Sequence, residues 1–241
     1  MMKTNLKKML VGVLLVVGGL QAMAIDVNFK LSLKQPGNDA VTYSLTKKDN
    51  QLTASKVLPL NISYQLTPQN DNLLLTVTLT AKERVYFNIG GSVPTNYQTD
   101  DCEFYLPGFW YHKNLRSPKE APSFHTSKSW NFREDRLSSP LTGVYDSRSG
   151  CTLTVLHHLG ERADALPTHQ EGEIILGGKT SVGYVGFDNE RGRASLTFGY
   201  PWVETPKRYI RKLTLVKPAT SFAKLEAGEQ MTLNWYIRES E

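Results

Sequence analysis

The sequence has little cysteine and little net charge, and both shortages exclude classes of protein. Two cysteines among 241 residues exclude a disulfide-dense scaffold and a zinc site made of four cysteines. A formal charge of +5, with 40% hydrophobic and 21% charged residues, excludes a disordered tail and a bundle of membrane helices. The abundant residues are 18 Gly, 12 Pro, 11 Tyr, 9 Phe and 4 Trp, a composition typical of a turn-rich β protein.

Residues 1–24 are predicted to be an export signal that is removed from the mature protein. Three lysines within residues 1–8 precede an apolar run at 9–20, which is too short to span a membrane comfortably. Ala22-Met23-Ala24 then has the small-x-small pattern of a cleavage site. We therefore expect a single periplasmic or secreted domain at 25–241, with no membrane attachment after the signal is removed. Loss of the three lysines lowers the formal charge from +5 to +2, which argues against a nucleic-acid partner.

Apolar and polar residues alternate through most of the mature chain, as in strands with one buried face. The alternation is clear at 27–33, 58–66, 73–79, 141–146, 151–157, 181–187, 194–200, 209–216 and 231–237. Short turns predict three hairpins, which join 62–66 to 73–79, 141–146 to 151–157, and 181–187 to 194–200. No window of a dozen residues after the signal has a helical apolar stripe. The predicted fold is all-β, a large antiparallel β-sandwich of the supersandwich-like type.

One segment, residues 90–140, interrupts this regularity. It contains Gly90-Gly91, Pro94, Pro107-Gly108 and further prolines, with brief strand signals such as 103–106. A compact domain rarely keeps so long an irregular insertion without a function. We therefore expect it to be a surface-projecting loop whose aromatic rings stay partly exposed.

Cys102 and Cys151 both lie in the mature chain, where an oxidising compartment would permit one disulfide between them. Such a bridge closes a loop of about fifty residues and would add roughly 4 kcal/mol in the chain-entropy model. Two buried thiols at strand positions are the alternative. The sequence alone does not decide between the two.

The irregular segment carries an aromatic and polar cluster suited to sugar. Trp110 and Tyr111 follow the turn at Pro107-Gly108, and His112 comes next. Sugar C–H groups stack on aromatic faces while polar side chains bind the hydroxyls. The alternative is that the rings anchor the segment onto the sandwich, since consecutive rings cannot all face one ligand.

A second cluster follows at Trp130 and residues 133–136. Glu134 and Asp135 are adjacent, and on an extended chain adjacent side chains point to opposite sides, so they do not readily flank one glycosidic bond. Arg133 and Arg136 are expected to form ion pairs with them, and in the alternative to bind hydroxyl or carboxylate groups of a glycan.

Metal, cofactor and nucleotide sites have no support in the sequence. The five histidines, His157-His158 among them, lack the spacing of a zinc motif, and Asp100-Asp101 lacks the rest of a calcium loop. There is no G-x-S-x-G elbow, P-loop or dinucleotide fingerprint. We therefore predict no metal and no cofactor.

Residues 130–141, the hairpin at 144–155 and the segment Leu225-Glu226-Ala227-Gly228-Glu229 before the last strand together carry a resemblance. The chain resembles the N-terminal β-sandwich module of exported bacterial polysaccharide-degrading enzymes, in which an (α/α) six-hairpin catalytic domain follows. The resemblance implies carbohydrate processing, with the catalytic residues on a separate or missing domain. No residue of this chain inherits a catalytic role from it.

Our leading hypothesis is an exported, non-catalytic module that binds or positions a polysaccharide or oligosaccharide for a glycoside hydrolase or lyase system. Its expected contacts are Trp110, Tyr111, His112, Trp130, Arg133 and Arg136. One alternative is a complete small carbohydrate-active hydrolase, lyase or epimerase that uses His112, Glu134 or the pair His157-His158. A second is a structural or surface-interaction protein.

Overall fold

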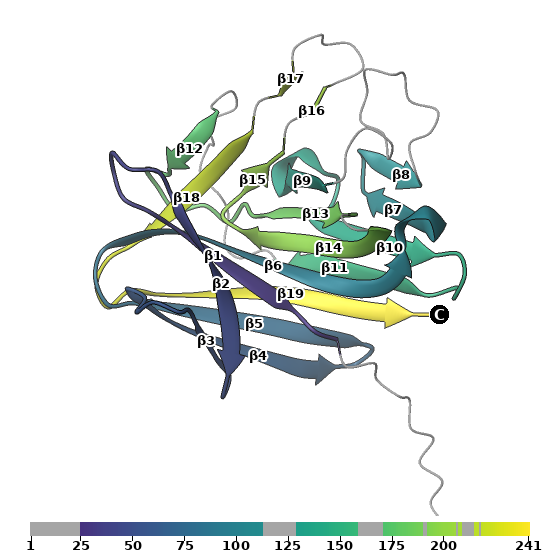
Figure 1. Cartoon of the computed structure of the whole chain (residues 1–241), viewed down its shortest axis with the longest axis horizontal. Helices are drawn as coiled ribbons and strands as arrows, with labels where there is room; N and C mark the ends of the chain where they lie inside the picture. Colours follow the sequence, from purple (N-terminus) through teal and green to yellow (C-terminus); the bar gives the residue numbers. More distant parts are fainter. Residues whose placement is uncertain are drawn as a thin grey trace, which may run out of the picture.

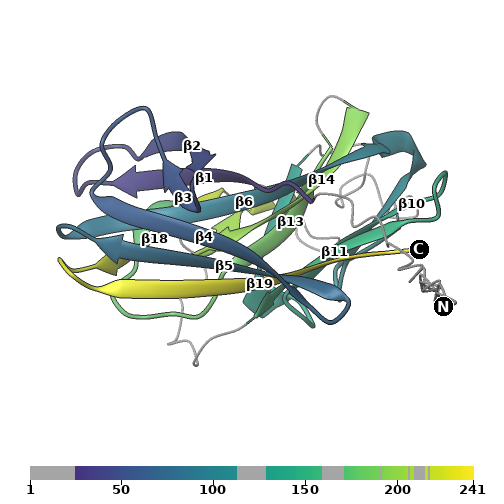
Figure 2. The ribbon, with the colours of Figure 1, turned by 90° about the horizontal axis from the view of Figure 1, so that it is seen from below.

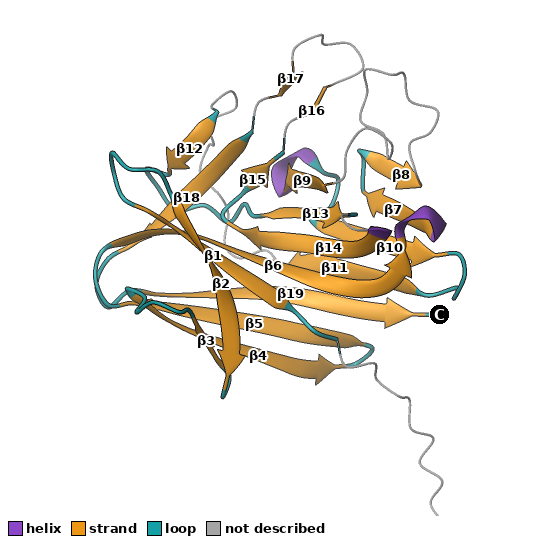
Figure 3. Cartoon of the chain, viewed as in Figure 1, coloured by secondary structure: helices purple, strands orange, loops and turns teal. Residues whose placement is uncertain are grey.

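The computed structural model describes residues 25–112, 129–158, 171–189, 192–205, 207–208, 215–216 and 218–241, and the predicted signal lies outside them. The described chain is all-β, a large curled sheet arrangement in two layers (Figures 1 and 2). Its helical residues include two single turns of 3-10 helix, η1 at Thr99–Asp101 and η2 at Glu134–Arg136 (Figure 3). Within the described ranges, no helix has the length and hydrophobicity needed to cross a bilayer.

One layer contains six strands in the order β2-β1-β6-β14-β13-β9, each antiparallel to its neighbours. Their bounds, in that order, are Val41–Lys48, Asn28–Lys34, Val85–Gln98, Arg193–Tyr200, Tyr184–Asp188 and Ser129–Arg133.

The other layer has the order β3-β4-β5-β19-β11-β10-β7-β8, again antiparallel throughout. Its strands, in that order, are Gln51–Thr53, Leu60–Gln69, Asn72–Ala81, Gln230–Ser240, Thr152–His158, Leu141–Asp146, Cys102–Leu106 and Trp110–His112.

Strand β2 joins the two layers, because its first part pairs with β1 and its last three residues pair with β3. Seventeen strands are thereby hydrogen-bonded into one continuous sheet. β18 (Ala219–Leu225) extends the first layer along β6 and also pairs with β15 (Val203–Glu204) and, in parallel, with β12 (Gly172–Ile175). β16 (Lys207–Arg208) and β17 (Leu215–Val216) form a separate two-stranded ladder.

The core lies between the layers and is made by the inward residues of each alternating strand. In β5, Leu75, Val77 and Leu79 are fully buried, while the threonines between them face outward and are partly exposed. In β19, Trp235 and Ile237 are buried in the same way. This alternation is what places one apolar surface on each layer, and the two surfaces pack against each other.

All three predicted hairpins are confirmed. β4 pairs with β5 around a turn at Asn70, which has a φ of 53°. β10 pairs with β11, and β13 pairs with β14. Of the strand expected at 209–216, residues 209–214 lie outside the described part, and only β17 at its end can be compared.

The irregular insertion is shorter than its glycines and prolines indicated. Residues 90–98 continue β6, the 14-residue strand that pairs with β1 on one side and with β14 on the other. Gly90 and Gly91 are there for packing and not for a turn: a Cβ at Gly91 would lie 2.4 Å from Cζ of Phe198, and one at Gly90 would lie 2.3 Å from Oη of Tyr184. What remains of the predicted loop, residues 113–128, lies outside the described residues.

The disulfide considered between Cys102 and Cys151 is not formed. Cys102 on β7 lies opposite Asp146 of β10, and the Asp146 backbone N–H donates to the Cys151 carbonyl on the far side, at 2.9 Å. One strand therefore separates the two cysteines. Two strand spacings amount to roughly 10 Å, beyond the reach of about 7 Å between the Cα atoms of a disulfide.

Candidate functional site

The predicted aromatic segment is built into the sheet. In β8, Trp110 lies across from Leu106 of β7. Trp110 is 0% exposed and Trp130 is 3% exposed, and their ring centroids are 5.4 Å apart. The expectation of partly exposed rings is therefore wrong for both tryptophans, because the inward positions of β8 and β9 are filled by the largest apolar side chains of the segment.

The backbones of Tyr111 and His112 pair with Tyr105 and Phe104 in the β7–β8 ladder. Their side chains lie outside the described part of the structure, so a role of these two residues in binding stays a prediction.

The arginines of the second cluster form ion pairs, as expected: Arg133 pairs with the expected Asp135, whereas Arg136 pairs with Glu204, outside the cluster. Arg133 is 2% exposed, so it is a buried group. Its Nε donates to Oδ1 of Asp135 at 3.0 Å and its Nη2 donates to Oδ2 at 2.6 Å, while the guanidinium lies 4.4 Å from the ring centroid of Trp202. Arg136 is partly exposed and pairs with buried Glu204 at 2.9 Å. Arg133 consequently has no face to present to a glycan in this conformation.

Glu134 turns away from the arginines and into the interior. Its Oε2 accepts a hydrogen bond from the Gly183 backbone N–H at 2.8 Å and lies 2.8 Å from Nδ1 of His157. Both side chains are 3% exposed, and the His157 ring stacks on Trp235 with centroids 5.3 Å apart. The structure thus brings together two residues, Glu134 and His157, that the sequence singled out separately.

This buried carboxylate–imidazole pair is enclosed on all sides. A substrate would reach it only if strands separated, because almost no surface of either side chain is exposed. The pair instead ties η2 to β11 and to the residue before β13, three segments that are far apart in sequence. Its geometry supports a structural role, even though both residue types occur in acid–base catalysis.

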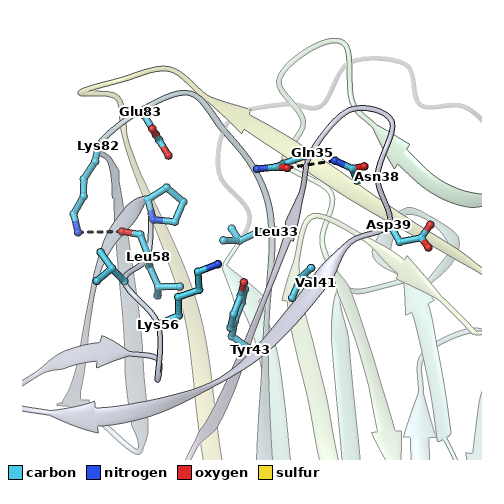
Figure 4. A pocket seen from close by; sticks show the side chains of 12 residues that line it. Leu33, Gln35, Asn38, Asp39, Val41, Tyr43, Lys56, Leu58, Lys82 and Glu83 are labelled. Atoms are coloured by element: carbon cyan, nitrogen blue, oxygen red, sulfur yellow. Dashed lines mark hydrogen bonds between the residues drawn. The ribbon is translucent and has the colours of Figure 1, made fainter.

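An open groove of about 690 Å³ lies where three turns meet, away from both predicted clusters (Figure 4). The turns are 35–40 between β1 and β2, 54–59 between β3 and β4, and 82–84 between β5 and β6. Its volume is within the range of sites for small molecules and short oligomers.

The lining of the groove combines one aromatic ring, an apolar rim, and positively and negatively charged groups that can form hydrogen bonds. Tyr43 is half-buried, and its hydroxyl and the Lys56 ammonium both point into the groove (Figure 4). Val57 and Val41 form exposed parts of the lining, at 88% and 52% exposure. Nζ of Lys82 donates to the Leu58 carbonyl at 3.1 Å, which fixes the turn on that side.

Within the described ranges, no group of three or more His, Cys, Asp or Glu side chains is placed so that it could hold a metal ion.

Sequence reasoning missed the groove because no local pattern encodes it. Tyr43 is one residue of an alternating strand, and Lys56 is one of many lysines. They become neighbours only when β2 crosses from one layer to the other and brings three turns together.

No protein-family model and no curated protein sequence matches the chain. Solved structures show a distant similarity of fold. Over 75% of this chain, the Slr1438 protein of Synechocystis sp. PCC 6803 gives a TM-score of 0.41 at 9% identity. A polysaccharide lyase gives 0.39 at 10% identity over 89% of the chain, and a galactose mutarotase related enzyme from Lactobacillus acidophilus gives 0.41 at 9% identity over 87%. The chain covers 55% of the first of these proteins, 25% of the second and 78% of the third.

Proposed function

We propose that this protein is an exported β-sandwich module that binds glycans, and that it positions them for a hydrolase or lyase whose catalytic domain is a separate partner. The observation that carries the proposal is the groove beside Tyr43, in which an aromatic ring, an apolar rim and hydrogen-bonding groups face the same open space. Sugars need this mixture, because their C–H faces stack on rings while their hydroxyls exchange hydrogen bonds.

All four tryptophans are buried, at 3% exposure or less. Ring stacking with a ligand therefore falls to tyrosines, and Tyr43 is the ring in the groove. Tyr111, His112 and Arg136 stay predicted glycan contacts at a second location. Trp110, Trp130 and Arg133 are no longer proposed as contacts.

The carboxylates of the groove distinguish the proposed binding role from glycoside hydrolysis. These carboxylates, Asp39 and Glu83, belong to different turns, and in Figure 4 that of Asp39 points away from the groove. A glycosidase needs two carboxyl groups facing one bond. The groove therefore lacks the carboxyl pair of a glycoside hydrolase, and binding without bond cleavage is what we propose for it.

Affinity gel electrophoresis against a panel of neutral and acidic polysaccharides tests the proposal. We expect at least one polysaccharide to retard the protein, and Tyr43→Ala to weaken that retardation by about tenfold in affinity, as loss of a stacking ring worth roughly 1.4 kcal/mol would do. Tyr145→Ala is the matched control, because Tyr145 is 39% exposed on β10 and does not line the groove.

Retardation by none of the polysaccharides would overturn the proposal and favour a structural or surface-interaction role. Equal retardation of Tyr43→Ala and the unmodified protein would show that the groove is not the glycan-binding site. In that case Tyr111→Ala tests the second location.

A further inference from the structure

The outer face of β4, β5 and β19 carries an unusual set of side chains. These strands lie side by side, with β5 in the middle (Figures 1 and 2). Three successive cross-strand rows contain only hydroxyl and amide side chains: Asn61–Thr80–Gln230, Ser63–Thr78–Thr232 and Gln65–Thr76–Asn234. We call these nine residues the hydroxyl–amide face.

The absence of charge on this face is its distinguishing feature. Outward positions of an antiparallel sheet are ordinarily polar, and they commonly include charged residues. Charged side chains do occur at exposed strand positions elsewhere, with Lys30 on β1, Lys48 on β2 and Arg238 further along β19 itself. None of the nine positions of the hydroxyl–amide face is Asp, Glu, Lys or Arg.

Three of the five hydroxyls of the face, those of Thr76, Thr78 and Thr232, are held by hydrogen bonds within it. Thr76 Oγ1 donates to Oδ1 of Asn234 at 2.9 Å, and the hydroxyls of Thr78 and Thr232 lie 3.3 Å apart. Threonine is stiff at χ1, so little rotamer entropy remains to be lost when such a hydroxyl binds a ligand.

An apolar and aromatic row borders the hydroxyl–amide face. Leu74 of β5 lies opposite Tyr236 of β19, which lies opposite Leu156 of β11. All three are half-buried, and the Tyr236 ring contacts His158 edge-on, with centroids 5.6 Å apart. A ring and two aliphatic side chains thus lie beside three rows of hydrogen-bonding groups.

We infer that the hydroxyl–amide face is a binding surface for an extended, uncharged polysaccharide, an inference that rests on the proposed glycan-binding function. A nucleic acid, an anionic lipid surface or a polyuronate would find no counter-charge on the nine positions, and an apolar protein partner would find no apolar patch within them. An uncharged chain of sugars matches the face in charge, exchanges hydrogen bonds with hydroxyls and amides, and places C–H faces on Tyr236.

The position of the face relative to the groove supports a polymeric ligand. Its first row begins two residues from Lys82 and Pro59, which line the groove, and the Lys82 N–H donates to the Pro59 carbonyl at 2.9 Å. Successive rows follow the strands at about 6.8 Å intervals, so the three rows extend the binding surface by roughly 14 Å. A chain of several sugar units spans that length, whereas a monosaccharide does not.

The test compares Thr78→Arg with Thr46→Arg in affinity gels that contain either a soluble uncharged glucan or a polyuronate. Thr78 is at the centre of the face, and Thr46 is an exposed threonine of β2 outside it. We expect Thr78→Arg to lose about tenfold in affinity for the uncharged glucan and Thr46→Arg to bind like the unmodified protein. Thr78→Val keeps the β-branched shape and replaces the hydroxyl by a methyl group; it should bind more weakly while its melting temperature stays close to that of the unmodified protein.

The outcomes separate this inference from the proposed function. Glucan binding that survives Thr78→Arg and Thr78→Val would overturn the hydroxyl–amide face as a site and leave the groove. Retardation by the polyuronate alone would overturn the inference that the ligand is uncharged, while glycan binding itself stands. Retardation by neither polymer, nor by any other member of the panel, would overturn both.

Discussion

At the scale of the residue, the Glu134–His157 pair is a polar contact enclosed in the described interior, with both side chains 3% exposed. One carboxylate oxygen serves both Gly183 and His157, while the other, Oε1, has no hydrogen-bond partner among the described residues. A buried group that loses a partner costs about 1–3 kcal/mol, because its desolvation is no longer offset.

Glu134→Gln should therefore lower the free energy of unfolding by about 1–3 kcal/mol, since an amide cannot supply the charge that two donors now share. Urea unfolding followed by tryptophan fluorescence measures the change. Glu83→Gln is the control, because Glu83 is exposed in the groove and should shift the midpoint little. An unfolding midpoint of Glu134→Gln equal to that of the unmodified protein would contradict the structural role of the pair.

Asp146 links stability to pH. Ser149 Oγ donates to its Oδ2 at 2.6 Å, and this hydrogen bond, with those from the backbone N–H groups of Ser149 and Arg148, lowers the pKa of Asp146. A carboxyl whose folded pKa is depressed stabilises the fold above its unfolded pKa of about 3.9, and the stabilisation is lost as pH falls through the lower folded value.

The unfolding free energy of the unmodified protein should thus fall between about pH 5 and pH 2, and Asp146→Asn should show a shallower acid dependence over the same interval. Ser149→Ala removes the main cause of the depressed pKa and should give an intermediate slope. Urea titrations at each pH provide the measurement. A profile for Asp146→Asn that runs parallel to that of the unmodified protein would show that this carboxyl does not contribute.

At the scale of the element, β6 is the strand whose sequence wrongly indicated turns and a loop. Gly90-Gly91 and Pro94 are ordinary signals of a turn, yet β6 continues through these residues without interruption. The Pro94 position lies opposite Ser195 of β14, next to the irregularity between Arg193 and Ser195 where the ladder shifts its register. The shift accommodates a residue without a backbone N–H, and the two glycines leave room for Tyr184 and Phe198.

Gly91→Val should destabilise the protein by about 1–3 kcal/mol, because the new side chain would overlap the buried Phe198 ring. Gly177→Val is the control, since nothing lies within 4 Å of a Cβ at Gly177. Both are compared by chemical unfolding. If the two variants lost the same stability, the close approach of Phe198 would not be the reason for glycine in β6.

At the scale of the whole molecule, aromatic residues that were expected at the surface are buried in the interior. A single core cluster draws on both layers and includes Trp110, Trp130 and Trp235. Surface chemistry is left to less conspicuous side chains, to Tyr43 in the groove and to the rows of Thr, Asn and Gln on the outer face. The polymer binding that we propose for this surface would depend on many modest contacts, which the regular spacing of the strands provides.

The alternation of apolar and polar residues determined most of the strands, the three hairpins and the side of each strand that is buried, because the two-residue period of a strand is a local property. It also contained a signal for the hydroxyl–amide face, since Thr76 and Thr78 occupy outward positions of the strand predicted at 73–79 and Thr80 continues the same alternation. Tertiary structure decided the rest. The burial of Trp110 and Arg133, the meeting of Glu134 with His157, the strand between the two cysteines and the groove at Tyr43 all depend on which distant strands become neighbours. That choice is made by packing two curled layers around one core, and no window of sequence contains it.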